Sequence, residues 1–185
     1  MLLDQKRTKR IVQVAAILTS IAFAGTIFVV MGLIFFGGGS SPEQDQINEL
    51  KGIVDREPDN PDAWQQLASA YIAGEDYQEA VAAAIRSVDL APKSYRNIST
   101  LALAMQSAGN PDGAVDALEQ FTARNPNNAE AFLQLGQSAS QIGRTNVARL
   151  AYQRFLELEP DSTQAQFVQE QLAELTGSPA AAPAQ

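Results

Sequence analysis

The sequence predicts an all-α protein in which an N-terminal transmembrane helix precedes an α-solenoid of paired helices. Two observations predict this fold class. Residues 11–36 form an uncharged apolar run that is long enough to cross a membrane. Beyond it, prolines recur every 34 residues, at Pro58, Pro92, Pro126 and Pro160. Two positions after each proline stands a residue that favours a helix N-cap: Asn60, Ser94, Asn128 and Ser162.

The amino-acid composition limits the functions that this protein can have. The 185 residues include no cysteine and no histidine. This excludes disulfides, Cys/His zinc sites, thiol nucleophiles and histidine acid–base catalysis. Residues 1–10 carry four basic residues and one acidic residue, while the rest of the chain carries nine basic and 20 acidic residues. The excess of acidic residues after residue 10 argues against a nucleic-acid partner, because phosphate binding depends on Lys and Arg.

The apolar run at 11–36 is expected to be a membrane anchor. Its 26 residues would extend about 39 Å as a helix, and a bilayer core of about 30 Å needs about 20 residues. The alternative is a secretory signal cleaved near residues 22–24. Cleavage there would leave residues 25–36 as a bare apolar N-terminus, and the run is longer than a signal's apolar region. We therefore expect an uncleaved single-pass helix.

The flanks of this run predict its orientation. Four basic residues precede the run: Lys6, Arg7, Lys9 and Arg10. Residues 37–42, which follow it, carry no positive charge. The positive-inside rule therefore places the flank 1–10 in the cytoplasm and the helical repeats outside it, anchored in the cell's inner (plasma) membrane.

A linker and a leading helix come next. Residues 37–41, Gly-Gly-Gly-Ser-Ser, have the composition of a flexible linker. Residues 42–57 open with Pro-Glu, which suits a first helical turn, and place Ile47, Leu50, Ile53 and Val54 on one face. Because Pro58 takes the place of the proline that closes each later repeat, this helix is interpreted as the second half of an incomplete repeat.

Three full repeats are expected at residues 61–94, 95–128 and 129–162. The first contains Trp64, Leu67, Ala68, Tyr71, Ala80, Ala84 and Pro92. The second has Ile98, Leu101, Ala102, Met105, Ala114, Leu118 and Pro126 at the same places. The third has Phe132, Leu135, Gly136, Ala139, Ala148, Tyr152 and Pro160. This pattern resembles the tetratricopeptide repeat (TPR) family. The resemblance implies a right-handed solenoid of helix pairs in which the small residues let the two helices of a pair approach closely.

Turns and ends complete the predicted domain. Gly74, Gly109 and Gly143 are expected to turn the chain within each pair in a left-handed conformation, with a slightly different turn at Gly74, which comes one position early. A capping helix is expected at 163–175, with Ser162 as its N-cap and with a polar outer face at Gln166 and Gln169. The Ala/Pro-rich residues 176–185 are predicted to be disordered.

The resemblance also implies a binding surface. In the family, the first helix of each repeat lines the concave face, which binds protein or peptide partners. The corresponding positions here are Asp62, Gln65, Ser69, Ile72, Arg96, Ser99, Leu103, Gln106, Glu130, Leu133, Gln137 and Gln141. These side chains are mostly neutral amides and hydroxyls with a few apolar residues. They lack the Lys/Asn set with which chaperone cofactors of the family hold a peptide carboxylate.

The predicted function is therefore a membrane-anchored scaffold that binds a protein or peptide partner and assists assembly of a protein complex. No catalytic pattern, cofactor motif or metal-ligand spacing is found, so an enzyme, a bound cofactor and a small-molecule substrate are not expected. Two sharper alternatives follow from anchored relatives. Residues 50–71 resemble the entry to the TPR subunit of cytochrome c maturation, which holds an apocytochrome segment. The chain also resembles single-span accessory subunits of the secretion translocon.

Overall fold

The computed structural model describes residues 41–177, and over that range the chain is all-α, as predicted. The predicted basic flank 1–10, the transmembrane helix 11–36 and residues 178–185 of the tail lie outside the described residues, as does the linker except for Ser41. Within 41–177, no helix is both long and apolar enough to cross a membrane.

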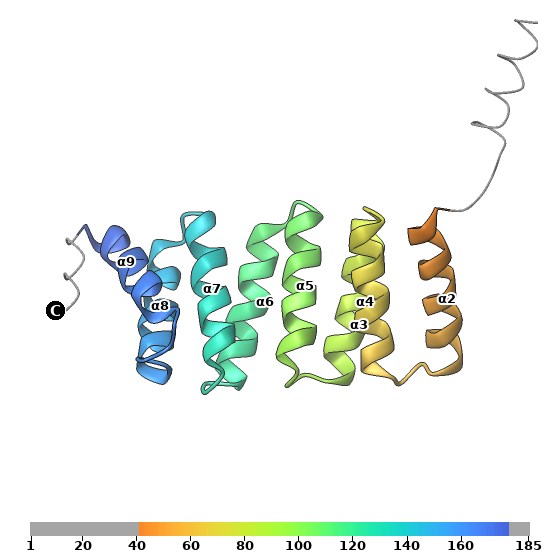
Figure 1. Ribbon diagram of the computed structural model, residues 1–185, viewed down its shortest axis with the longest axis horizontal. Helices are drawn as coiled ribbons and strands as arrows, with labels where there is room; N and C mark the ends of the chain where they lie inside the picture. Colours follow the sequence, from red (N-terminus) through yellow and green to blue (C-terminus); the bar gives the residue numbers. More distant parts are fainter. Residues whose placement is uncertain (1–40, 178–185) are drawn as a thin grey trace, which may run out of the picture. The chain divides into compact units, whose positions relative to one another are not determined.

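Eight helices follow one another across the described range (Figure 1). They are α2 (Pro42–Arg56), α3 (Pro61–Ala73), α4 (Tyr77–Leu90), α5 (Tyr95–Ser107), α6 (Pro111–Arg124), α7 (Ala129–Gln141), α8 (Thr145–Leu158) and α9 (Ala165–Thr176). Helices α3 with α4, α5 with α6, and α7 with α8 form pairs that stack side by side in chain order. Helix α2 precedes the first pair and α9 follows the third.

The first helix of each pair begins at the residue that the sequence marks. The side chain of Asn60 accepts a hydrogen bond from the backbone N–H of Ala63 at 3.2 Å. Asn128 accepts one from Ala131 at 2.9 Å, and Ser94 caps α5 in the same way. Each bond satisfies an N–H that has no partner within the helix, which fixes where α3, α5 and α7 start.

The expected cap at Ser162 is wrong. Helix α9 begins at Ala165, and the hydroxyl of Ser162 is buried without a hydrogen-bond partner among the described residues. The reason is local. The backbone N–H of Ala165, which a capping Ser162 would take, donates instead to the carbonyl oxygen of Ser162 at 3.0 Å. The chain makes a turn at 162–165, and the helix starts two residues later than predicted. The helix also runs on to Thr176, followed by Gly177 in a left-handed cap, so the tail begins no earlier than residue 178.

The turn within each pair contains one residue with positive φ: Glu75 at 62°, Gly109 at 77° and Gly143 at 75°. Gly74 has φ of −82°, so the prediction of a left-handed glycine there is wrong. Since the three positive-φ residues are spaced by the repeat period, the backbone turn is the same in every pair. In the first pair a glutamate occupies the position that elsewhere holds glycine.

Small residues lie where the helices of a pair cross. Ala68, Ala102 and Gly136 are all completely or nearly completely buried. Gly136 lies directly against the ring of Tyr152, and a methyl group at position 136 would overlap that ring. The corresponding positions of the second helices hold Ala84, Leu118 and Tyr152. The largest of these, Tyr152, packs against the smallest residue, Gly136, which keeps this part of the core close-packed.

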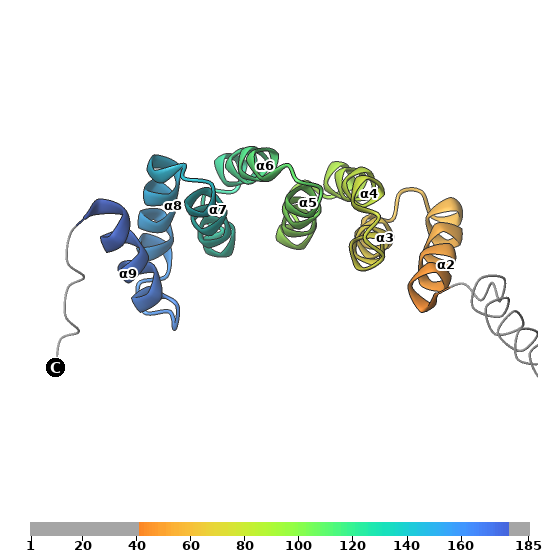
Figure 2. The same ribbon diagram turned by 90° about the horizontal axis from the view of Figure 1, so that it is seen from above.

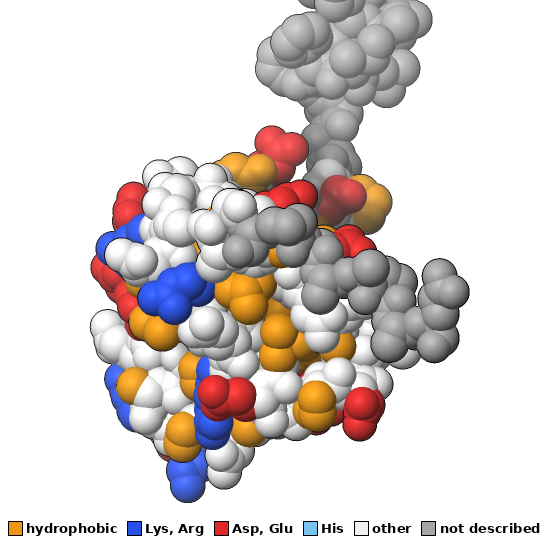
Figure 3. Space-filling model, turned by 90° about the vertical axis from the view of Figure 1, so that its left-hand side faces the viewer, with side chains coloured by type: hydrophobic (Ala, Val, Ile, Leu, Met, Phe, Trp, Pro, Cys, Tyr) orange, Lys and Arg blue, Asp and Glu red, His pale blue; other side chains and the backbone are white. Residues whose placement is uncertain are grey.

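The stacked pairs form a curved solenoid in which α3, α5 and α7 lie on the inner side and α4, α6 and α8 on the outer side (Figure 2). The C-terminal end is formed by α9, on which Gln166 and Gln169 are exposed, as a capping helix requires. Phe167 is exposed as well. Seen end-on, hydrophobic side chains gather among polar ones on this end of the molecule (Figure 3).

Candidate functional site

The candidate site is the concave face formed by α3, α5 and α7 (Figure 2). All twelve sequence-predicted lining residues belong to these three helices. They fall into rows of residues spaced 34 apart, so that each row crosses the face from repeat to repeat. The row that contains Ile72 and Gln106 continues 34 residues later at Ser140. The predicted lining residue Gln141 is therefore one position away from this row. Gln141 is exposed as the last residue of α7.

Two of the predicted lining glutamines connect neighbouring repeats. The side-chain amide of Gln65 donates to the hydroxyl of Thr100 at 2.9 Å, which joins α3 to α5. The amide of Gln106 donates to the hydroxyl of Ser138 at 3.0 Å, which joins α5 to α7. These bonds hold the inner helices in register, so the two amides have a structural role besides any contact with a partner. Thr100 and Ser138 were not among the predicted residues, because a hydroxyl in a helix has no distinctive sequence pattern.

The predicted apolar residues differ in exposure. Leu103 is 49% exposed although its neighbours Leu101 and Ala104 are buried. Ile72 is half-buried against the core, and Leu133 is only 8% exposed. An exposed aliphatic side chain among polar neighbours on a concave surface gains free energy when a partner covers it. Leu103 is therefore the main apolar contact point that this face offers.

A pocket of about 390 Å³ opens on this face between α5 and α7. Its lining brings together four predicted residues, Ser99, Glu130, Leu133 and Gln137, with three that the sequence did not indicate, Tyr95, Gln134 and Gln164. Gln164 comes from the turn before α9, so the end of the solenoid contributes to the pocket. Sequence reasoning missed these three because they do not lie in the family's lining rows, and Gln164 reaches the pocket only through the chain's tertiary path.

The electrostatics of this pocket are dominated by one carboxylate. No basic side chain lines it. Burial raises the pKa of the Tyr95 hydroxyl, a hydrogen bond with Ser99 lowers it, and the negative charge of Glu130 raises it further. Tyr95 is therefore neutral at physiological pH. Glu130 itself makes no ion pair within residues 41–177.

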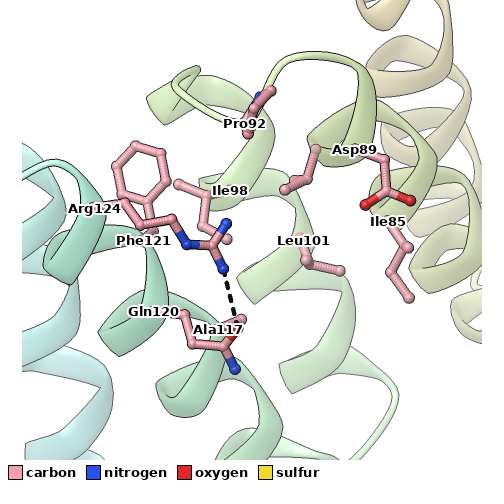
Figure 4. A pocket seen from close by; sticks show the side chains of 10 residues that line it. Ile85, Asp89, Pro92, Ile98, Leu101, Ala117, Gln120, Phe121 and Arg124 are labelled. Atoms are coloured by element: carbon pink, nitrogen blue, oxygen red, sulfur yellow. Dashed lines mark hydrogen bonds between the residues drawn. The ribbon is translucent and has the colours of Figure 1, made fainter.

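The outer side carries three grooves that recur with the repeat period. Each lies between successive outer helices with an inner helix as its floor. Their volumes are about 430 Å³ between α2 and α4, about 170 Å³ between α4 and α6, and about 340 Å³ between α6 and α8. Figure 4 shows the second, where Ile85 on α4 faces Phe121 on α6 across Ile98 and Leu101. Arg124 and Gln120 bond to each other at its rim.

Trp64 lies in the first of these grooves. Its ring packs against the core but remains partly exposed, and its N–H donates to the carbonyl oxygen of Pro58 at 2.8 Å. The bond ties the start of the first full repeat to the end of the leading helix. Trp64 is thus a packing residue, although it does not completely fill the space between α2 and α4.

The main charge cluster is structural. Arg144, at the start of α8, pairs with Asp116 at 2.6 Å, Glu119 at 3.3 Å and Asp112 at 3.4 Å, all on α6. The hydrogen bond to Asp116, more than the other charges, raises the pKa of Arg144. The pairs link two outer helices at the surface. In the part of the chain that the structure describes, no group of acidic side chains is arranged to hold a metal ion.

Comparison with known proteins agrees with this architecture. Two family models, both described as tetratricopeptide repeat, match the chain, one at residues 61–94 and the other at residues 100–163 and 133–185. Small glutamine-rich tetratricopeptide repeat-containing protein 2 from Mycosarcoma maydis is 30% identical over 91 residues, which are 49% of this chain and 26% of that protein. The human PEX5-related protein is 27% identical over 77 residues, which are 42% of this chain and 12% of that protein. The chain thus spans about a quarter or less of these relatives.

Solved structures share the fold at low sequence identity. A crystal structure of MamA has a TM-score of 0.58 at 20% identity, covering 75% of this chain and 86% of that one. MamA from Desulfovibrio magneticus RS-1 has a TM-score of 0.57 at 19% identity, covering 82% and 83%. A tetratricopeptide repeat protein from Parabacteroides merdae ATCC 43184 has a TM-score of 0.62 at 18% identity, covering 84% and 60%.

This fold is typically a non-enzymatic scaffold for protein–protein interactions. The 34-residue helix pairs, the stacking of inner and outer helices and the two family models, which together match more than half of the sequence, all lead to one assignment. The chain belongs to the tetratricopeptide repeat family.

Proposed function

We propose that this chain is a membrane-anchored scaffold that binds a protein or peptide partner on the concave face of its solenoid and so assists assembly of a protein complex. The observation that carries the proposal is the exposure of Leu103 on the inner helix of the central repeat. An exposed apolar side chain at the centre of a concave face has the position in which interface hot spots occur.

The groups around Leu103 favour a polypeptide partner. Ser99 and Gln137 supply a hydroxyl and an amide, which can each donate or accept hydrogen bonds. Such groups suit the alternating N–H and C=O groups of a peptide backbone, while Leu103 contacts a side chain. The partner is therefore expected to present an apolar residue within an exposed segment.

The membrane anchor is the part of the proposal that depends on sequence alone. Residues 11–36 have the length and apolarity of a spanning helix, and the basic flank before them favours a cytoplasmic N-terminus. The solenoid would then act outside the cytoplasm. Two kinds of partner are compatible with that location, an apocytochrome segment and an exported polypeptide chain, and the identity of the captured partner decides between them.

A pair of matched variants tests the binding face. Leu103→Glu is expected to lower recovery of the partner from a detergent extract at least tenfold, because a charge facing an apolar partner group is desolvated without compensation. Ile85→Glu is the control, since Ile85 is exposed to a similar extent but lies in an outer groove. It should leave recovery unchanged.

Partners are identified by mass spectrometry, and melting curves of both variants are recorded alongside. The proposal requires that Leu103→Glu retain the melting temperature of the wild type while losing the partner. Equal recovery by the two variants, with equal melting, would exclude the concave face as the binding surface. Loss of the partner by Ile85→Glu alone would move binding to the outer grooves.

A further inference from the structure

The pocket between α5 and α7 has an asymmetric set of side chains. Tyr95 and Ser99 come from the first two turns of α5, Glu130, Leu133 and Gln134 from the first two turns of α7. Gln137 and Gln164 complete the lining. One of these groups is charged, and its charge is negative. The pocket therefore has a net negative charge and no basic side chain in its lining.

The hydrogen-bonding groups of the pocket have unused acceptor capacity. Glu130 is exposed, and no hydrogen bond or ion pair satisfies its carboxylate within the described residues. The side-chain oxygen of Gln134 is buried without a hydrogen-bond partner. A buried acceptor without a partner is energetically unfavourable, so the amide gains free energy if it turns toward a donor that enters the pocket. Both groups thus favour a ligand that donates hydrogen bonds.

The walls suit a side chain with an apolar stem. Leu133 provides an aliphatic surface. Tyr95 provides a half-buried aromatic ring, and the face of such a ring attracts a cation held within about 6 Å. Lys and Arg combine an aliphatic stem with a cationic, donor-only end. The pocket volume of about 390 Å³ accommodates such a side chain in full.

We propose that this pocket binds a lysine or arginine side chain of the partner, with Glu130 and Gln134 accepting from the cationic end. The inference rests on the proposed concave-face function and specifies it further. The partner segment carries a basic residue beside the apolar residue that contacts Leu103. Ser99 in the pocket lies one helical turn before Leu103, about 6 Å along the axis. Two residues of an extended peptide cover the same distance and place both side chains on one face.

Defined peptides provide the test. The probe is a fluorescein-labelled peptide of Ala, Gly and Ser that carries one leucine and, two positions later, one arginine. A second peptide replaces the arginine with citrulline, which keeps the shape but is neutral, and a third replaces it with glutamate. Binding to the full-length chain in detergent is measured by fluorescence anisotropy. The arginine peptide should bind about five- to tenfold more tightly than the citrulline peptide, because a charge-assisted hydrogen bond is stronger than a neutral one but is weakened by solvent in a partly exposed site.

The protein offers a matched pair of variants. Glu130→Gln removes the carboxylate of the pocket, whereas Glu79→Gln removes a carboxylate from the outer helix α4, outside the pocket and the concave face. Both residues are exposed and lie in the first turn of a helix, so the two changes have similar effects on folding and on net charge. Glu130→Gln should reduce arginine-peptide affinity to that of the citrulline peptide. Glu79→Gln should change it less than twofold.

The outcomes separate this inference from the proposed function. Equal affinity of the wild type for the arginine and citrulline peptides would overturn the cation pocket while leaving peptide binding intact. Equal losses in Glu130→Gln and Glu79→Gln would overturn it too, because the preference would then reflect the overall negative charge. Failure of all three peptides to bind would also overturn it. The proposed function would still be judged by recovery of the natural partner with Leu103→Glu, which involves none of these peptides.

Discussion

At the residue scale, Glu75 occupies a backbone conformation that the other repeats give to glycine. A left-handed conformation costs an L-residue about 1–2 kcal/mol, whereas glycine adopts it without a steric penalty. The first repeat therefore contains a strained turn. It lies between α3 and α4, at the edge of the molecule, where the exposed side chain of Glu75 makes no hydrogen bond or ion pair within residues 41–177 to offset the strain.

Replacing this residue gives a direct test. Glu75→Gly should raise the free energy of unfolding by about 0.5–1 kcal/mol, because relief of strain exceeds the entropy that glycine adds to the unfolded chain. The change is measured as a shift of the denaturant midpoint at constant slope. Gly109→Ala, at the equivalent turn of the second repeat, should have the opposite sign. A lower midpoint for Glu75→Gly would show that the glutamate side chain stabilises the turn.

At the scale of elements, the packing of two helices in a pair depends on complementary sizes at one crossing point. Gly136 on α7 and Tyr152 on α8 are the extreme case, since the tyrosine ring occupies the space of a Cβ at position 136. In the second repeat, the corresponding positions hold Ala102 and Leu118, which are both completely buried. Interiors are close-packed, so neither helix can yield easily to an added methyl group.

Gly136→Ala should therefore destabilise the domain by about 1–3 kcal/mol through overpacking. Adding Tyr152→Leu, which recreates the pair found in the second repeat, should recover part of that loss. Thermal or chemical unfolding of both single variants and of the double variant gives the interaction energy. A coupling of about 0.5–3 kcal/mol is expected for side chains in contact. Strictly additive effects would show that the two residues do not compete for the same space.

At the scale of the whole molecule, the described solenoid has terminal helices of two different kinds. Helix α2 takes the place of an outer helix and α9 that of an inner one, so each end carries half of a repeat. Exposed polar residues such as Gln46 and Glu49 on α2 and Gln169 and Glu170 on α9 separate the core from solvent. This limits the stacking of further copies, as terminal repeats of a solenoid must.

The proposed anchor makes a prediction at the same scale. If residues 11–36 span the inner membrane with the basic flank in the cytoplasm, the solenoid lies on the opposite side. Protease added after only the outer barrier of the cell is opened should then digest or release residues beyond 40. If these residues stay protected until the inner membrane is lysed, the predicted orientation is wrong. If salt and alkali extract the intact chain completely without detergent, the predicted membrane anchor is wrong.

The sequence by itself determined the helical class and the repeat. The 34-residue spacing and the N-cap residues Asn60, Ser94 and Asn128 are local features that act on adjacent backbone N–H groups. Local signals of this kind survive in any tertiary context. The place of Leu103 on the concave face was implied by the resemblance to the tetratricopeptide family, and its 49% exposure comes from the structure.

Only the tertiary structure decided the features that depend on contacts between distant residues. Ser162 resembles the other N-cap residues. In the turn between α8 and α9, however, the backbone N–H of Ala165 donates to the carbonyl oxygen of Ser162, so the Ser162 hydroxyl does not accept that hydrogen bond. Glu75 is left-handed because the closure of α3 on α4 requires that turn, whatever residue occupies it. The pocket combines Tyr95 with Glu130 and Gln164 from three segments that meet through the curvature of the solenoid. Contacts between residues that are far apart in the chain leave no periodic pattern in a single sequence. They can therefore be identified only from the packed helices.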